Sequence, residues 1–263
     1  MKLPTNKIIC GDCVNILETF PENCIDLTVT SPPYGNLRDY YNYTFDFKAI
    51  AFQLLRVTKL GGVVVWVVSD TTVKGSRTLT SFEHALYFKQ IGFNVHDVMI
   101  YYKKNFSMPS KTRYHNIYEL MIIFSKERPK TFNPIKDRKN ICAGQTRKGK
   151  NTKRQVDGSM KTLAPNDENK PVYNEFGMRH NIWVLKSAGQ EKMCKSLDHP
   201  AMFPEQLAND HILSWSNPGD TVLDPMCGSG TTCKMAKLNN RNYIGIDISE
   251  EYCDLSRRRV DNL

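Results

Sequence analysis

The sequence has no hydrophobic run long enough to cross a bilayer, since its longest uninterrupted apolar stretch is Val63–Val68. A membrane-spanning helix needs about 20 consecutive apolar residues. The N-terminal segment MKLPTNKIICGD also lacks the long apolar stretch, followed by small residues, that marks a secretory signal peptide. We therefore expect a protein of the cytoplasm that has no membrane partner.

Paired cysteines are scarce. The chain has eight cysteines, and only Cys10-Gly-Asp-Cys13 shows the C-x-x-C spacing of a metal or redox site. No second close pair follows, and the six histidines show no ligand spacing around it. Scattered cysteines are typical of buried thiols in a reducing compartment. The sequence therefore favours core packing of these thiols, and we expect no metal site.

Negative charge is in deficit, because 36 lysines and arginines stand against 27 acidic residues and give a formal charge of +9. Residues 136–154 hold eight of the basic residues and one aspartate, so this stretch alone carries +7. Such a concentrated patch predicts a polyanionic partner. The alternative is a solvated, disordered loop.

The 263 residues are enough for one large domain, or for one domain with an insertion. The hydrophobic pattern predicts strands at Lys7–Gly11, Cys24–Thr30, Gly62–Ser69, Val95–Tyr102, Glu119–Phe124, Thr221–Asp224 and Tyr243–Asp247. It predicts helices at Cys13–Phe20, Ala49–Lys59, Ser81–Gly92, Pro204–Ser214, Thr231–Leu238 and Glu250–Val260. This alternation indicates an α/β fold with a mostly parallel sheet covered on both faces.

Two regions depart from the alternation of strands and helices. The strands at 95–102 and 119–124 have no helix between them, so we expect an antiparallel hairpin at one edge of the sheet. Residues 127–181 are rich in Lys, Asn, Pro and Gly and have little apolar periodicity. We interpret them as an insertion outside the sheet.

The segment TVLDPMCGSGTT, residues 221–232, predicts a nucleoside-binding unit. A short apolar strand ends in Asp224, a turn contains Gly228 and Gly230, and a helix begins at Thr231. Glycines let the backbone approach a ligand, and the N-terminus of a helix offers free N–H groups. Asp247 ends the next strand, where a carboxylate can accept hydrogen bonds from both ribose hydroxyls. The alternative is that the glycines serve only the turn.

A second segment, TSPPYG at residues 30–35, interrupts a predicted strand abruptly. Neither Pro32 nor Pro33 has a backbone N–H, so the strand cannot continue through them. Ser31 and Tyr34 flank this rigid corner at the carboxyl end of the strand, where open α/β sheets bind their ligands. On its own, the motif is also consistent with a proline-rich turn that packs a tyrosine.

Together, DPMCGSGTT and TSPPYG resemble the S-adenosylmethionine-dependent DNA amino-methyltransferases, which methylate N4 of cytosine or N6 of adenine. The segments HPAMFPEQLA and YELMIIFSK also resemble parts of that family, so the likeness covers roughly residues 7–126 and 182–260. One departure is Met226, where the family usually has phenylalanine. Methionine can also pack on a cofactor.

The order of the motifs resembles the beta group of this family, because TSPPYG precedes the glycine loop. The fold implied is a circularly permuted, Rossmann-like methyltransferase sheet with an inserted target-recognition region. The strand at 7–11 should then lie beside the strand at 243–247, with Asp12 near the cofactor adenine. The implied parts are a target-base part at 1–126, a DNA target-recognition insertion at 127–181 and a cofactor part at 182–263.

The resemblance also implies site residues. Those assigned to S-adenosylmethionine are Asp12, His199, Phe203, Asp224, Pro225, Met226, Cys227, Gly228, Ser229, Gly230, Thr231, Asp247 and Ile248. Those assigned to the flipped target base are Ser31, Pro32, Pro33 and Tyr34. The residues of the basic insertion that are expected to bind double-stranded DNA are Arg147, Lys148, Lys150, Lys153 and Arg154.

The chemistry expected at TSPPYG is methyl transfer to an exocyclic amine. Ser31 and the Pro32 carbonyl can each accept a hydrogen bond from the amine, and the Tyr34 ring can stack on an extruded base. The sequence has no Pro-Cys dipeptide, the nucleophile motif of enzymes that methylate ring carbon C5. In the family that the sequence resembles, serine in the first position of the motif goes mostly with N4-cytosine, so the resemblance implies N4-cytosine, with N6-adenine as the alternative.

Two other classes of function remain open: methylation of RNA or of a protein amide, and nucleic-acid binding without catalysis. The resemblance also predicts that the enzyme belongs to a restriction-modification system, in which a cognate restriction endonuclease is a possible partner. A monomer and a homodimer are both consistent with the sequence.

Overall fold

The computed structural model describes residues 3–33, 45–103, 111–145, 152–162, 173–186 and 204–263. The chain divides into two compact units. Unit 1 comprises Met1–Asn133 and Asn181–Leu263, and unit 2 comprises Pro134–His180. The insertion expected at 127–181 overlaps unit 2, although residues 127–133 belong to unit 1.

Unit 1 is built on an eight-stranded sheet with the order β1-β14-β13-β2-β3-β7-β6-β12. Its strands are β1 (Lys7–Cys10), β2 (Ile25–Thr30), β3 (Thr58–Val68), β6 (Asn94–Lys103), β7 (Tyr118–Ser125), β12 (Ile182–Leu185), β13 (Thr221–Asp224) and β14 (Asn242–Asp247). Strands β1, β14, β13, β2 and β3 pair in parallel, so their carboxyl ends meet at one edge. The α/β fold and mostly parallel sheet expected from the sequence are confirmed.

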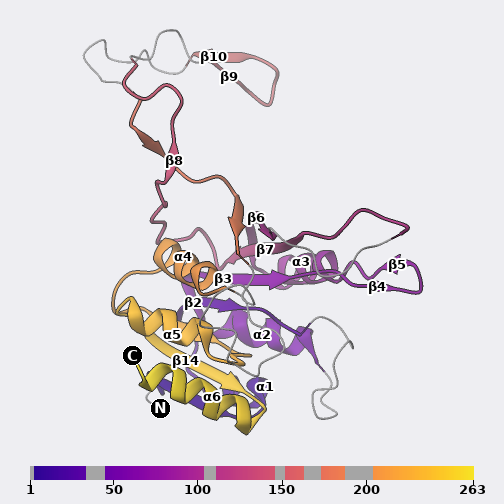
Figure 1. Cartoon of the computed structure of the whole chain (residues 1–263), viewed down its shortest axis with the longest axis vertical. Helices are drawn as coiled ribbons and strands as arrows, with labels where there is room; N and C mark the ends of the chain where they lie inside the picture. Colours follow the sequence, from indigo (N-terminus) through magenta and orange to yellow (C-terminus); the bar gives the residue numbers. More distant parts are fainter. Residues whose placement is uncertain (1–2, 34–44, 104–110, 146–151, 163–172, 187–203) are drawn as a thin grey trace. The chain divides into compact units, whose positions relative to one another are not determined.

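The permuted connection is also present. Strand β1 pairs with β14 in parallel, with Lys7 opposite Ile244 and Cys10 opposite Asp247. The two chain ends therefore lie at the same end of unit 1, as Figure 1 shows. The strand expected after the last helix of the chain is supplied by its N-terminal segment.

The antiparallel hairpin of β6 and β7 forms as expected, but it is not at the edge of the sheet. Strand β12 lies outside it and pairs with β6 in parallel, with Ile182 opposite Ile100. The sequence predicts no strand at residues 182–185. This segment has only four residues, and it is not preceded by a predicted helix as most of the parallel strands of the sheet are. This is the main correction to the expected topology.

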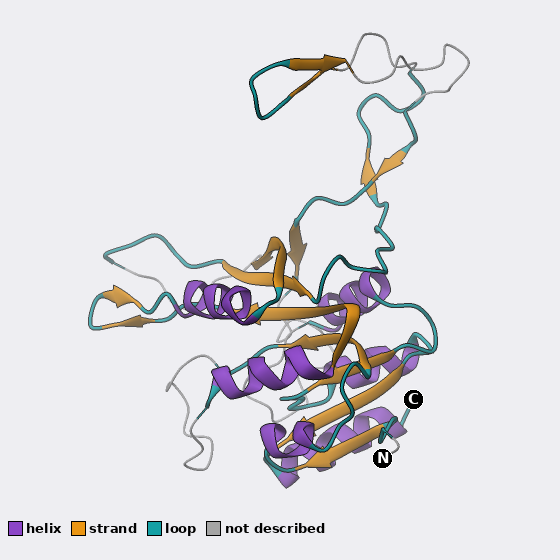
Figure 2. Cartoon of the chain, turned by 180° about the vertical axis from the view of Figure 1, so that it is seen from behind, coloured by secondary structure: helices purple, strands orange, loops and turns teal. Residues whose placement is uncertain are grey.

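Six helices of the described chain cover both faces of the sheet, as Figure 2 shows. They are α1 (Cys13–Glu18), α2 (Phe47–Val57), α3 (Thr80–Ile91), α4 (Glu205–Trp215), α5 (Thr231–Leu238) and α6 (Glu250–Asp261). The side chains of Asp12, Asp46 and Ser249 cap α1, α2 and α6 by accepting backbone N–H groups of the first turn.

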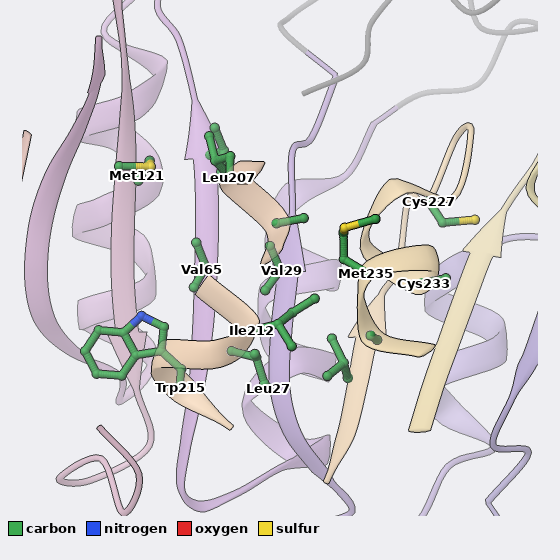
Figure 3. Close-up of a cluster of buried hydrophobic side chains, with 14 of the residues drawn as sticks. Leu27, Val29, Val65, Met121, Leu207, Ile212, Trp215, Cys227, Cys233 and Met235 are labelled. Carbon is green, nitrogen blue, oxygen red and sulfur yellow. The ribbon is translucent and has the colours of Figure 1, made fainter. Parts of the chain in front are cut away.

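Two hydrophobic clusters form the core, one for each face of the sheet, because successive strand residues point to opposite faces. Leu27, Val29 and Val65 belong to the cluster under α4, α5 and α6 (Figure 3). Val64 and Trp66, one position away, belong to the cluster that also contains residues of α1, α2 and α3. Strands buried on both faces explain the near-continuous run of valine in β3.

Unit 2 contains two short antiparallel pairs. Strand β8 (Arg138–Lys139) pairs with β11 (Phe176–Gly177), and β9 (Thr152–Arg154) pairs with β10 (Met160–Thr162). In this unit, Arg179 forms an ion pair with Asp137 and lowers the pKa of that carboxyl group. Within the described parts of both units, no helix is long and apolar enough to span a membrane.

Candidate active site

The centre of the parallel sheet forms a topological switch point. From β13 the chain passes through α5 to β14 on one side, whereas from β2 it passes through α2 to β3 on the other. Open α/β sheets bind ligands in the crevice outside the carboxyl ends of such neighbouring strands. Strand β13 ends at Asp224, the first residue of DPMCGSGTT, and Ser31, Pro32 and Pro33 follow β2, so the described residues of both predicted motifs lie at this edge of the sheet.

Two buried hydrogen bonds join the end of β2 to the end of β13 and to the start of α5. The Thr30 hydroxyl donates to the Asp224 carboxylate at 2.8 Å, and the Thr232 hydroxyl donates to the Val29 carbonyl at 3.0 Å. Thr30 immediately precedes Ser31, and Thr232 lies in the first turn of α5. The two motifs are therefore directly connected. Neither threonine was assigned a role from the sequence, because the residues that they contact are about 200 positions away.

The glycine loop between β13 and α5 has two glycines with positive φ, +48° at Gly228 and +78° at Gly230. Gly230 is also constrained by packing, because a Cβ there would lie 2.0 Å from the Ser256 hydroxyl oxygen of α6. The Cys227 N–H donates to the Ile246 carbonyl at 2.8 Å and fixes the loop to β14. The loop is therefore a narrow backbone turn, and position 230 has room only for glycine.

Asp247 holds the other side of this loop. Its carboxylate accepts the Gly228 N–H at 2.8 Å and the Ser249 N–H at 3.0 Å, and burial raises its pKa. Each carboxylate oxygen has further acceptor capacity, so ribose hydroxyls can still bind there. The next residue, Ile248, is 40% exposed and supplies an apolar surface.

Asp12 is placed near Asp247 by the sheet, because Cys10 pairs with Asp247 and the β1 strand then ends. The Asp12 carboxylate accepts the Asn15 N–H at 2.9 Å and caps α1. Two carboxylates and an apolar side chain thus follow the carboxyl ends of β1 and β14. This set of groups fits the ribose and adenine of a nucleoside.

A network of charged residues from α4, α5 and α6 contacts the glycine loop. The Arg259 guanidinium of α6 donates to the Ser229 carbonyl at 2.6 Å and to the Ser229 hydroxyl at 2.8 Å. It also pairs with Glu205 at 2.8 Å, and Glu205 pairs with the buried Lys234 at 2.6 Å. Arg259, Glu205 and Lys234 are not predicted from the sequence, because nothing in the local pattern of α6, α4 or α5 distinguishes them from surface charges.

The remaining predicted residues divide into described and undescribed positions. Pro32 and Pro225 are buried, and Ser31, Pro33 and Met226 are partly buried. Thr231 is buried at the first position of α5. Lys153 and Arg154 lie on β9 in unit 2 and are exposed. The predictions for Tyr34, Arg147, Lys148, Lys150, His199 and Phe203 lie outside the described residues.

Comparison with known proteins identifies the family of the chain. The family model of N6/N4 DNA methylases matches residues 25–258. The chain belongs to this family. It is 53% identical over 254 residues to the orphan methyltransferase M.BamHII of Bacillus amyloliquefaciens, covering 96% of this chain and 91% of that protein. The family resemblance stated from the two motifs is confirmed.

Solved structures show the same fold for this DNA methyltransferase. PvuII DNA methyltransferase, described as cytosine-N4-specific, has a TM-score of 0.69 at 21% identity, with 96% of this chain and 85% of that chain covered. The M1.HpyAVI–SAM complex has a TM-score of 0.62 at 22% identity, with 96% and 98% covered. The cofactor of this methyltransferase is S-adenosylmethionine, as expected from the sequence.

The Arg259 network gives a testable prediction for the methyltransferase. We expect Arg259→Ala to weaken S-adenosylmethionine binding about tenfold, because it removes two charge-assisted hydrogen bonds that hold Ser229 in the glycine loop. Isothermal titration calorimetry measures this affinity. The matched control is Arg258→Ala, which removes an exposed arginine of the same helix. Equal affinities of the two variants would contradict a positioning role for Arg259.

Asp224 predicts a pH dependence of stability. Burial raises its pKa from 3.8 to about 6, so between these values the folded protein holds a proton that the unfolded chain releases. The stability that this proton contributes is present below pH 3.8 and is lost as the pH rises through 6. In an Asp224→Asn variant the side chain would not titrate, and its oxygen could accept the same bonds from Thr30 and the Met226 N–H.

We therefore predict that Asp224→Asn gains stability relative to the wild type as the pH rises from about 4.5 to about 7.5, by roughly 2 kcal/mol. Urea unfolding at both pH values measures the difference. Burial lowers the pKa of His84 to about 4, which favours the opposite trend, but His84 is present in both proteins and its contribution cancels. A difference in stability that does not change with pH would contradict the prediction.

Proposed function

We propose that this DNA methyltransferase transfers a methyl group from S-adenosylmethionine to N4 of a cytosine that has been flipped out of the DNA duplex. The observation that carries the proposal is the hydrogen bond from Thr30 to Asp224, which joins the residue before Ser31 to the residue at which the glycine loop begins. A transferred group and its acceptor must be held in one geometry for the reaction to proceed, and this bond connects the two binding motifs directly.

Ser31, Pro32 and Tyr34 form the proposed site for the target amine. The exocyclic amine is a poor nucleophile, since its lone pair is delocalised into the ring. Hydrogen bonds from the amine to the Ser31 hydroxyl and the Pro32 carbonyl favour the pyramidal nitrogen of the transition state. Pro33 restricts the backbone, so the Pro32 carbonyl keeps its direction at little entropic cost. Tyr34 supplies a ring face on which the extruded base stacks.

The cofactor is assigned to the groups at the ends of β13, β14 and β1. When bound, S-adenosylmethionine supplies an activated methyl group on a sulfonium. Asp247 is the proposed acceptor for the ribose hydroxyls, and Ile248 and Asp12 are assigned to the adenine. The loop from Asp224 to Thr231 is assigned to the methionine part, where glycine allows close backbone approach. His199 and Phe203 retain their assignment from the sequence.

Cytosine is favoured over adenine by one residue, Ser31, where adenine-specific members of the family mostly have aspartate. The experiment is to incubate the enzyme with DNA of varied sequence and S-adenosylmethionine, and to analyse the nucleosides of the product. We expect N4-methylcytosine. N6-methyladenine as the only product would refute the assignment of the base. The absence of either product would instead favour RNA or a protein amide as the substrate.

Specific DNA recognition is assigned to the insertion, through Lys153 and Arg154 on β9 and through Arg147, Lys148 and Lys150. The name of the 53% identical relative describes it as an orphan, and this favours action without a partner endonuclease over a restriction-modification pair. If the enzyme acts alone, extracts of the cells that produce it should contain no endonuclease that cleaves the unmethylated form of its recognition site.

A further inference from the structure

A second group of basic residues lies outside the insertion, on unit 1. Strands β4 (Thr72–Val73) and β5 (Ser76–Arg77) form a hairpin that carries Lys74 and Arg77. The segment that leads into β7 carries Lys111 and Arg113. We call residues 72–77 and 111–115 together the hairpin surface.

The topology brings the hairpin surface to the same sheet edge as Ser31. The hairpin follows the carboxyl end of β3, which pairs in parallel with β2. The segment 111–115 precedes β7, which runs antiparallel to β3, so β7 begins at the edge where β3 ends. Figure 1 shows β4 and β5 projecting beyond that end of β3.

Hydrogen bonds make the two segments one surface. The Arg113 guanidinium donates to the Thr72 hydroxyl at 3.1 Å and to the Gly75 carbonyl at 2.9 Å. The Thr78 N–H donates to the Thr71 carbonyl at 3.0 Å and closes the base of the hairpin. Arg113 therefore has a structural role, and the other cations remain available to a ligand.

The charge and composition of the hairpin surface fit a nucleic acid. Lys74 and Lys111 are exposed, Arg77 is partly exposed, and none of the three forms an ion pair among the described residues. Neither segment contains an acidic residue. Tyr114 is fully exposed beside them. Exposed cations interleaved with an aromatic ring are typical of surfaces that contact phosphates and bases.

We propose that the hairpin surface binds the phosphate backbone of duplex DNA beside the flipped base, as a DNA contact separate in sequence from the basic insertion. The proposal rests on the proposed function, because it takes Ser31 and Tyr34 as the site of the target base. Phosphate contacts fix the register of a duplex on a protein, and a flipped nucleotide requires its flanking backbone to be held. The hairpin surface supplies these contacts at the edge where the base enters.

The test compares two triple variants of the whole chain. The first, Lys74→Gln/Arg77→Gln/Lys111→Gln, neutralises the hairpin surface but keeps Arg113. The second, Lys7→Gln/Lys89→Gln/Arg258→Gln, removes three exposed cations from elsewhere on unit 1 and matches the change in net charge. A fluorescent DNA duplex of about 30 base pairs, roughly three helical turns, is titrated at several NaCl concentrations. Calorimetry with S-adenosylmethionine checks that each variant is folded.

We expect the first variant to bind the duplex at least about tenfold more weakly, with a salt slope smaller by about two to three, since each lost phosphate contact lowers it by about 0.9. The control should change the affinity less than about threefold and leave the slope unchanged. Both should bind S-adenosylmethionine like the wild type. Equal affinities and slopes for the two variants would overturn the inference.

Failure of this inference is distinguishable from failure of the proposed function. If the wild type yields N4-methylcytosine and the first variant binds DNA as the control does, only the hairpin surface is wrong. If the wild type yields N6-methyladenine, the assignment of the base is wrong, and the binding comparison still decides the role of the hairpin surface. A wild type whose affinity for the duplex does not depend on salt would overturn the inference by itself.

Discussion

Asp247→Ala is expected to weaken S-adenosylmethionine binding about 100-fold, the largest effect that we predict for a single change in the cofactor site. The substitution removes the proposed acceptor for the ribose hydroxyls. It also leaves the Gly228 and Ser249 N–H groups without the carboxylate that accepts them at 2.8 and 3.0 Å. Binding is measured by calorimetry, and DNA affinity is measured in parallel and should persist.

Asp247→Asn separates the two contributions to cofactor binding. Asparagine keeps one acceptor oxygen and the shape of the side chain, so we expect an affinity between those of the wild type and Asp247→Ala. Asp261→Ala, at the exposed end of α6, serves as a control for loss of a carboxylate. Unchanged cofactor affinity in a folded Asp247→Ala protein would refute the ribose assignment.

Tyr34→Ala is expected to lower turnover on DNA by about 10- to 100-fold, because loss of a base-stacking ring costs about 1–3 kcal/mol. The affinity for S-adenosylmethionine should remain that of the wild type, since the substitution leaves the glycine loop unchanged. Tyr34→Phe keeps the ring face and should retain most of the activity. If Tyr34→Phe is as impaired as Tyr34→Ala, the hydroxyl group matters and the stacking assignment is wrong.

Ser31→Ala tests the neighbouring position by a different measurement. The acceptor that it removes is assigned to the transition state, so kcat should fall by a larger factor than KM for DNA rises. A rise in KM with unchanged kcat would instead mean that Ser31 stabilises the bound substrate and the transition state equally. Steady-state kinetics at saturating S-adenosylmethionine distinguishes the two outcomes.

The elements with the sharpest local signals were predicted most accurately from the sequence. Strand β13 and helix α5 have the predicted bounds, Thr221–Asp224 and Thr231–Leu238. A fully buried apolar run followed by a glycine turn leaves little freedom for either boundary. Strand β3, in contrast, begins at Thr58 and not at the predicted Gly62, because its first residues include Lys59 and Gly61 and have no strand pattern.

What the sequence could not predict depends on contacts between distant residues. The bond between Thr30 and Asp224 spans 194 positions, and the contact of Arg259 with Ser229 joins a charged helix face to a turn. A pattern within one segment identifies the periodicity of that segment but not its partner in space. Strand β12 was missed for the same reason, because its four residues form a strand only against β6.

The pairing of β1 with β14 has a consequence for when the enzyme becomes active during its synthesis. Lys7 is synthesised well before its partner Ile244, because most of the described sequence lies between them. Closing the long loop between β1 and β14 is entropically costly and slow. We therefore expect β1 to remain unpaired while the centre of the sheet forms. The carboxylates of Asp12 and Asp247 come together only with this last pairing. We therefore expect the proposed nucleoside site to be completed, and methylation of DNA to begin, only after translation has passed β14.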